Sequence, residues 1–287
     1  MAVVLSKIGI ATPLGHSVSE FVHRVKSRSG ALSNIPELEL LEHPLGAKVQ
    51  DISLKDIIKK RKEIKLYTRA ASLGVLAAHR CLGVYQDPEV GLFVAVGREP
   101  PDEGSAESCL IASQASGRFQ EVLLAEQGRA LYPPLLPLRT LPNMILAHIS
   151  IQFDIMGDNA CWAGDEEMGI QAMQSGYWAI QEGRCTKALV GAADSFVSLG
   201  LARDLHRNKI VPPSEAGVFF LLEQKERPVT GDTVLSWSEQ PQEDMRYPLE
   251  TLLGYTGAAQ RLLELVFLNH ENEFITWGGI SMRKQLL

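Results

Sequence analysis

The sequence predicts an α/β protein in which helices alternate with buried strands. Several short segments are apolar at every position, which is typical of strands covered on both faces of a sheet. Between them lie longer segments whose apolar residues recur every three or four positions, the spacing of one helix face. Because the two kinds of segment alternate along 287 residues, they favour one large α/β domain or two fused halves.

The first third of the chain predicts two strands and two helices. Val3 to Ile10 is a β-branched run, and the turn residues Thr12-Pro13-Leu14-Gly15 end it. Ser17 to Lys26 and Leu66 to Leu82 repeat small or apolar residues at helical spacing. Gly91 to Val96 is short and wholly apolar, so it is expected to be a strand buried in the middle of a sheet.

The middle of the chain contains the clearest helix. Repeated prolines make residues 98 to 142 the least regular part of the first half. Met144 to Phe153 is apolar and predicted to be helical. Asp165 to Glu182 follows, with Asp165 as its cap and Gly183 closing it.

The clearest helix has one side made of small residues, and its other side is bulky and apolar. The small residues recur at i, i+3, i+7 and i+10 and are Gly169, Ala172, Gly176 and Ala179. A helix that is apolar around so much of its circumference is expected to be buried, with another backbone close to its small side. Taken alone, this pattern indicates a core helix and no function.

The last hundred residues predict three further strands, one helix and a final strand. The strands are Lys187 to Ala193, Ala216 to Leu222 and Thr233 to Trp237. The helix spans Gly254 to Leu268, and the last strand, Phe274 to Trp277, is followed by a Gly-Gly turn.

Composition excludes several classes of function. The net charge of -6 makes nucleic acid an unlikely partner, and the basic run from Lys59 to Lys65 is most simply a solvated face. The four cysteines are scattered and form no metal-ligand spacing, so neither a metal nor another cofactor is expected. No segment has the length of a transmembrane helix or the form of a signal peptide, so we expect a protein of the cytoplasm.

Several segments, in this order and spacing, resemble the β-ketoacyl synthases of the thiolase superfamily. They are Ile8 to Gly15, Leu141 to Asn159, Ala188 to Asp194, Ala216 to Glu223 and Gly257-Ala258-Ala259. The resemblance implies a thiolase-like layered fold, with sheets around buried central helices and a truncated second half. It also implies an organisation into residues 1–223, the thiolase-like half with the nucleophile-type helix 165–183, and residues 224–287, a reduced half packed onto it as one globular unit.

The resemblance places a glutamate where the family has its nucleophile. That nucleophile is a cysteine at the start of the buried helix, where the helix terminus lowers the thiol pKa. An ungapped alignment over 154–183 puts Glu166 at this position, and glutamate cannot perform the acyl transfer of a thiolate. A rival alignment puts the nucleophile at Cys161, but it requires five extra residues inside a helix whose two ends already match.

The second half lacks the other catalytic groups that the resemblance implies. One family histidine would fall at Gly254 and the lysine at Leu249, and the loop that holds the second histidine has no counterpart. Ser214 to Gly217 also replaces a glycine-rich turn beside the old active site. The ketosynthase-type acyltransferase activity is therefore predicted to be lost, and no catalytic residue is assigned.

Three functions follow from this interpretation. The first is a non-catalytic binding partner, scaffold or adaptor and chaperone in a bacterium, which would include the loading of a secreted effector cargo. The second is a subunit that resembles a chain-length factor and pairs with an acyl-carrier-dependent ketosynthase. The third is an enzyme with a remodelled site, a decarboxylase or hydrolase that uses Glu166 or Cys161.

A protein partner is expected in the first two cases: a second copy, a ketosynthase-like protein or a secretion cargo. The resemblance implies that two sheets join edge to edge, so this contact is expected at one of the apolar segments of the first half, with Lys187 to Ala193 nearby. An acyl ligand is not expected.

Overall fold

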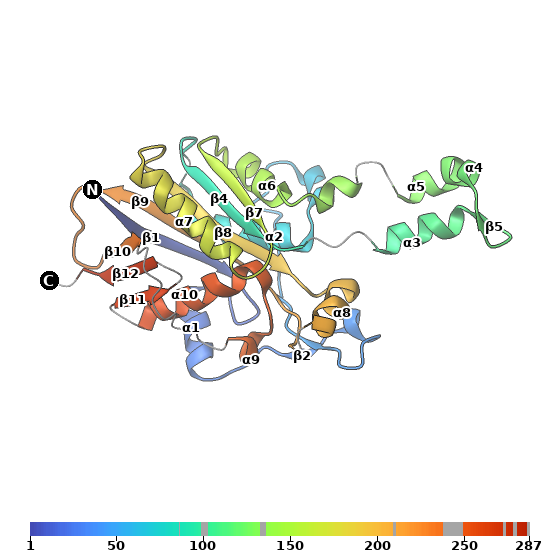
Figure 1. The fold of residues 1–287 in the computed structure, drawn as a ribbon, viewed down its shortest axis with the longest axis horizontal. Helices are drawn as coiled ribbons and strands as arrows, with labels where there is room; N and C mark the ends of the chain where they lie inside the picture. The colour runs from blue at the N-terminus through green and yellow to red at the C-terminus, as the bar shows by residue number, and fades with distance from the viewer. Residues whose placement is uncertain are drawn as a thin grey trace.

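The computed structural model describes residues 1–85, 87–98, 103–132, 136–208, 211–237, 249–271, 274–277 and 280–285. Figure 1 shows one large twisted sheet with helices on both faces, and a helical arm that projects from one end. Residues 238–248 and the predicted Gly278-Gly279 turn lie outside the described residues.

The large sheet has eight strands in the order β11-β12-β10-β1-β9-β8-β4-β7. Strands β4, β7 and β8 run parallel to one another, whereas the remaining neighbours are antiparallel. Its strands are β1 (Ala2–Ala11), β4 (Gly91–Val96), β7 (Asn159–Ala163), β8 (Lys187–Ser195), β9 (Glu215–Lys225), β10 (Thr233–Trp237), β11 (Phe274–Trp277) and β12 (Ile280–Lys284). Two short hairpins, β2 (Ser33–Asn34) with β3 (Leu45–Gly46) and β5 (Gln114–Ala115) with β6 (Arg118–Phe119), lie outside it.

Helices cover the two faces of the sheet and divide the core in two. One core cluster joins the sheet to α1 (Val18–Lys26), α7 (Met168–Gln181) and α10 (Gln260–Glu271). The other joins it to α2 (Arg69–Leu82) and α6 (Met144–Phe153). Strand β4 is buried along its whole length because it lies between the two helical layers. The short helices α8 (Leu199–Asn208) and α9 (Glu250–Leu253) lie below the sheet in Figure 1.

The small side of α7 packs as the sequence predicts. A Cβ added to Gly176 would lie 2.3 Å from Cγ2 of Val190 on β8, so the helix rests directly on the sheet. A Cβ on Gly169 would lie 2.8 Å from the carbonyl oxygen of Ala258, just before α10. Ala172 and Ala179 are fully buried. The expected burial of this helix is confirmed.

Most predicted elements form near their predicted bounds, but the start of α7 differs. The helix begins at Met168 rather than at Asp165. The carboxylate of Asp165 accepts the backbone N–H of Glu167 at 3.1 Å, and its carbonyl accepts that of Met168 at 3.2 Å. Asp165 therefore closes a turn ahead of the helix, a local bond that competes with helical geometry.

One edge of the sheet lies two strands away from Lys187 to Ala193. Strand β8 lies between β4 and β9 in the middle of the sheet, so its backbone is fully paired and cannot join a second sheet. The edge strand at this end of the sheet is β7, which pairs with β4. The sequence did not predict it because Asn159 to Ala163 contains no β-branched residue. Lys187 to Ala193 is therefore not itself an edge strand.

The proline-rich region contains an arm that projects away from the sheet (Figure 1). It comprises α3 (Glu103–Ala112), the hairpin β5–β6, α4 (Glu121–Leu123) and α5 (Arg129–Leu131), with a π-helical segment Leu124–Gly128. Its exposed apolar side chains include Leu110, Ile111 and Val122.

The C-terminal strands extend the same sheet. Strand β10 pairs with β1, and β12 pairs with β10 over five residue pairs. In the part of the chain that the structure describes, no helix is both long and apolar enough to cross a membrane.

Candidate functional site

The N-terminus of α7 faces the loop that precedes α10, and Glu166 and Tyr255 meet there. Glu166 lies in the turn before the helix, and its carboxylate accepts a hydrogen bond from the Tyr255 hydroxyl. Burial raises the pKa of Tyr255, and the bonded carboxylate of Glu166 raises it further. The phenol therefore stays protonated and acts as a hydrogen-bond donor.

Tyr255 is held in place from several directions. Its backbone N–H donates to Pro212 at 2.8 Å, and its carbonyl accepts the N–H of Ser214 at 3.0 Å. Its ring packs edge-on against Phe196, with 5.1 Å between the ring centroids. The bond from Tyr255 to Glu166 thus fastens two segments that are far apart in sequence.

The next carboxylate, Glu167, pairs with a buried arginine. The guanidinium of Arg261 on α10 lies 3.2 Å from Glu167 and 3.0 Å from Glu264. Arg261 is only 2% exposed, so its charge requires this compensation. The signal that could have found it is the charged pair Arg261 and Glu264 inside an otherwise largely apolar helix.

Asp194, at the end of β8, fixes the Gly257-Ala258-Ala259 segment. Its carboxylate accepts the N–H of Ala258 at 3.0 Å and that of Ser195 at 2.9 Å. A Cβ on Gly257 would lie 1.9 Å from this carboxylate, and Gly257 has φ +54°. Only glycine allows Asp194 to approach so closely.

The positions that the resemblance assigns to the lysine and one histidine are structural here. Leu249 is fully buried in the core formed with α7 and α10. Gly254 has φ +77°, and a Cβ there would lie 2.6 Å from the carbonyl oxygen of Pro212. A histidine cannot occupy Gly254 without a shift of the 212–214 segment.

Cys161, the rival nucleophile, lies in the middle of β7 and not at a helix terminus. Its thiol contacts the carbonyl of Pro142 at 3.6 Å, on the side of the sheet that carries α6. Desolvation raises the pKa of this thiol to about 11. The structure does not bring Cys161, Glu166, Gly254 and Leu249 together as one reactive cluster.

A second buried network lies behind this region. Glu215 accepts bonds from the Arg69 guanidinium at 2.6 Å, from the Val49 N–H at 2.7 Å and from the Ser195 hydroxyl at 2.9 Å. The Ser195 hydroxyl thus donates to a carboxylate that is already paired with the Arg69 guanidinium. Among the described residues, no three His, Cys, Asp or Glu side chains are grouped to hold a metal ion.

These features define a thiolase-like fold, in which the buried helix α7 packs on a mixed sheet. Residues 84–218 match the family described as "Beta-ketoacyl synthase, N-terminal domain". The thiolase-like α/β fold class predicted from the sequence is confirmed by this match and by solved structures.

Solved structures agree over nearly the whole chain. The ishigamide ketosynthase/chain length factor is 16% identical, with a TM-score of 0.65 and coverage of 98% of both chains. A type II PKS ketosynthase, in complex with its acyl-carrier protein and bound to the hexaketide, is 14% identical, with a TM-score of 0.70 and coverage of 99% of both chains. A β-ketoacyl synthase from Burkholderia phymatum STM815 is 13% identical, with a TM-score of 0.64 and coverage of 99% of this chain and 100% of that one. No curated protein matches the sequence.

Proposed function

We propose that this chain is a non-catalytic thiolase-fold protein that works by association, as a scaffold or adaptor for another protein. The observation that carries the proposal is the outer edge of β7, with which no strand of the described part of the chain pairs. Both halves of the chain, 1–223 and 224–287, serve this role as one unit, because their strands share that sheet.

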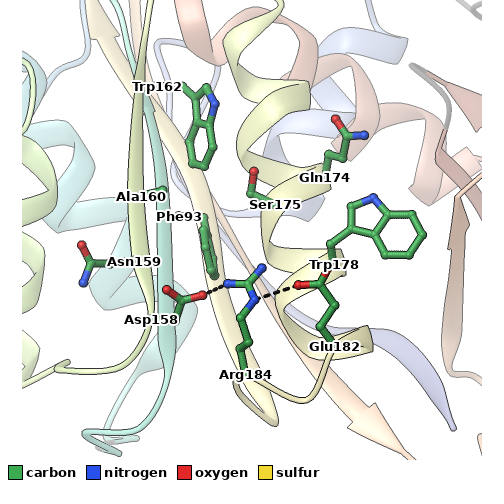
Figure 2. A pocket seen from close by; sticks show the side chains of 10 residues that line it. All are labelled: Phe93, Asp158, Asn159, Ala160, Trp162, Gln174, Ser175, Trp178, Glu182 and Arg184. Atoms are coloured by element: carbon green, nitrogen blue, oxygen red, sulfur yellow. Dashed lines mark hydrogen bonds and ion pairs between the residues drawn. The ribbon is translucent and has the colours of Figure 1, made fainter.

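The β7 edge is short but lacks the charged side chains and prolines that often protect an edge strand. Met156, in the segment that leads into β7, is 78% exposed, and Trp178 of α7 lines a groove beside the strand (Figure 2). An unprotected edge flanked by exposed apolar side chains is the surface expected of a protein that pairs.

The state of the old catalytic position supports a non-catalytic role. Glu166 is bonded to Tyr255, Glu167 is paired with Arg261, and Gly254 cannot accept a side chain on this backbone. Each of these residues holds two segments together or allows them to pack closely. For a decarboxylase or hydrolase that uses Glu166, the neighbouring acid would be Tyr255, whose raised pKa makes it a poor proton donor. For one that uses Cys161, the raised pKa of the thiol is unfavourable.

A subunit that resembles a chain-length factor is the second candidate. It is favoured by the likeness to the ishigamide ketosynthase/chain length factor along 98% of both chains. In that case the β7 edge would receive a ketosynthase-like protein instead of a second copy. The scaffold and the chain-length-factor-like subunit would both use the β7 edge. They differ in which protein binds there.

We predict that the purified protein neither condenses acyl and malonyl thioesters nor becomes acylated. At pH 7 a thiol with a pKa of about 11 is a thiolate in only about one molecule in 10⁴, so Cys161 is a weak nucleophile. Intact-mass spectrometry after incubation with an acyl thioester should show the unmodified mass. A stable adduct on Cys161 at neutral pH would contradict the non-catalytic proposal.

We also predict that the protein pairs through the β7 edge. Light scattering behind a sizing column should give about twice 31.5 kDa. Met156→Glu should raise the dissociation constant at least about tenfold, because it places a charge in an apolar contact. Val229→Glu is the matched control: Val229 is 61% exposed and lies in the loop before β10, so this change should leave pairing unaltered.

Two results would count against the pairing. One is a wild-type monomer at every concentration that also fails to bind a co-expressed ketosynthase-like protein. The other is an equal increase in the dissociation constant for Met156→Glu and Val229→Glu, which would place the contact away from the β7 edge. Pairing only with the ketosynthase-like protein would select the second candidate.

A further inference from the structure

His16 lies directly after the turn that ends β1, and its ring contacts helix α2. Two backbone hydrogen bonds between Thr12 and Gly15, each 3.1 Å long, close this turn. Nδ1 of His16 lies 2.9 Å from Nη1 of Arg80, which belongs to the last turn of α2. The same Nη1 donates to the carbonyl of Ile10 at 2.8 Å. Arg80 therefore joins the last turn of α2 to the end of β1 and to the residue that follows its turn.

The contact with Arg80 fixes the protonation state of the His16 ring. A guanidinium has N–H donors and no acceptor, so Nδ1 of His16 must accept this hydrogen bond. The ring is then neutral, with its single proton on Nε2. A protonated ring carries N–H groups on both nitrogens, so it would face Arg80 donor to donor and cation to cation. The bond between His16 and Arg80 therefore forms only when His16 is neutral.

Groups on two other segments act on the ring in the opposite direction. Glu20 on α1 and Asp51, in the segment after β3, are acidic and favour the protonated form, as does a hydrogen bond to the backbone of Gln50. Glu20 also accepts the backbone N–H of His16 at 3.1 Å, so its carboxylate is already beside this residue. Burial and the Arg80 guanidinium outweigh these groups and hold the pKa of His16 below its ordinary value of 6.5.

The segment around Gln50 is fixed from two sides, and His16 is one of them. The neighbouring residue Val49 donates its N–H to Glu215 at 2.7 Å and accepts from the Arg69 guanidinium at 2.6 Å. Those bonds belong to a buried ion pair, whereas the ring of His16 is only half-buried. His16 is thus the titratable member of a contact that joins α1, α2 and this segment.

We propose that His16 is an acid-sensitive switch, which accepts a hydrogen bond from Arg80 when neutral and exchanges Arg80 for the carboxylates of Glu20 and Asp51 when protonated. The proton comes from solvent and is held on Nδ1, and no covalent bond between heavy atoms changes. The exchange releases the last turn of α2 from His16, and the remaining bond from Arg80 to Ile10 then holds that turn alone. The switch is separate from the β7 edge and does not depend on the proposed pairing.

The exchange makes the fold less stable in mild acid. In the unfolded chain the His16 imidazole takes up a proton near pH 6.5, whereas in the folded chain it does so only at a lower pH. Between these two values the unfolded chain binds more protons, so stability falls as the pH falls. The contribution of His16 is fully present above this window and fully lost below it. From pH 7.5 to pH 5.5, His16 alone should lower the folding equilibrium constant by up to about tenfold.

An NMR titration of the His16 ring in the full chain tests its partners. The ring should take up its proton at a lower pH in the folded chain than in the same chain unfolded in urea. Arg80→Met removes the donor and its charge, so it should move the titration of His16 to higher pH. Glu20→Gln removes a carboxylate that favours the charged ring, so it should move the titration to lower pH. A His16 titration that Arg80→Met leaves unchanged would overturn the proposal.

Urea denaturation at pH 7.5 and pH 5.5 measures the consequence for stability. His16→Asn keeps an acceptor for Arg80 but cannot titrate, and His43→Asn, at a histidine whose side chain is 80% exposed, is the matched control. The wild type and His43→Asn should lose stability in acid to the same extent, and His16→Asn should lose less. Burial also lowers the pKa of His148, so all three proteins carry that acid loss and the difference between them isolates His16.

Hydrogen exchange tests the release of α2 directly. The N–H of Gly83 donates to His79 at 2.7 Å and closes the last turn of the helix. After correction for the pH dependence of the intrinsic rate, this amide should be less protected at pH 5.5 than at pH 7.5 in the wild type, and equally protected at both in His16→Asn. Equal protection in the wild type, or equal acid losses of the wild type and His16→Asn, would overturn the switch. If His16→Asn does not fold, the titrations of the wild type, Arg80→Met and Glu20→Gln decide the question.

Discussion

Replacing Glu215 by alanine should lower the free energy of unfolding by about 3–5 kcal/mol. The side chain is fully buried and accepts bonds from Arg69, from the Val49 backbone and from Ser195. Its removal leaves the Arg69 guanidinium without its carboxylate partner and two further donors without an acceptor. A loss of this size is a large part of the stability of an ordinary domain.

The matched control is an ion pair at the surface. Arg98 and Asp204 approach to 3.4 Å, but their side chains are 77% and 47% exposed. Asp204→Ala should therefore cost at most about 1 kcal/mol. Urea denaturation of the two variants beside the wild type measures the difference. Equal, small losses would mean that the Arg69–Glu215 pair does not organise this part of the core.

Substituting Gly176 by leucine should destabilise the protein by about 1–3 kcal/mol or more. The Cβ atom of the new leucine alone would lie 2.3 Å from Val190 and 3.4 Å from Phe93. Helix α7 would have to lift from the sheet to make room, which would also disturb the groove beside β7.

A second helical glycine gives the control. A Cβ on Gly104 of α3 meets nothing within 4 Å, so Gly104→Leu should not destabilise and gains helix propensity. Thermal and urea unfolding, followed by circular dichroism, compare the two variants. An unchanged midpoint for Gly176→Leu would show that α7 does not rest on the sheet as described.

The sequence predicted the fold where the pattern is local and missed features that depend on distant contacts. The spacing of Gly169 and Gly176 indicated a buried helix, because helical periodicity is visible within one segment. Strand β7 was missed because five residues are too few to show alternation and contain no β-branched side chain.

The candidate site shows the same limit. The resemblance located Glu166 near the helix start, but the partner of Glu166 is Tyr255, 89 residues away in sequence. The Arg69–Glu215 pair joins residues 146 apart. No local pattern links such residues, and each is visible only once the sheet has brought them together.

The backbone at Gly254 sets a limit on the directed evolution of this scaffold. Gly254 has a positive φ and lies close to Pro212, so any side chain there would be strained. Substitution of Gly254 by histidine alone would therefore destabilise the protein without restoring activity. A library aimed at acyl transfer would have to vary residues 212–214 together with Gly254. Single-site mutagenesis would lose the Gly254 variant because it is unstable. Substitutions that create new binding surfaces do not meet this constraint and are easier to select.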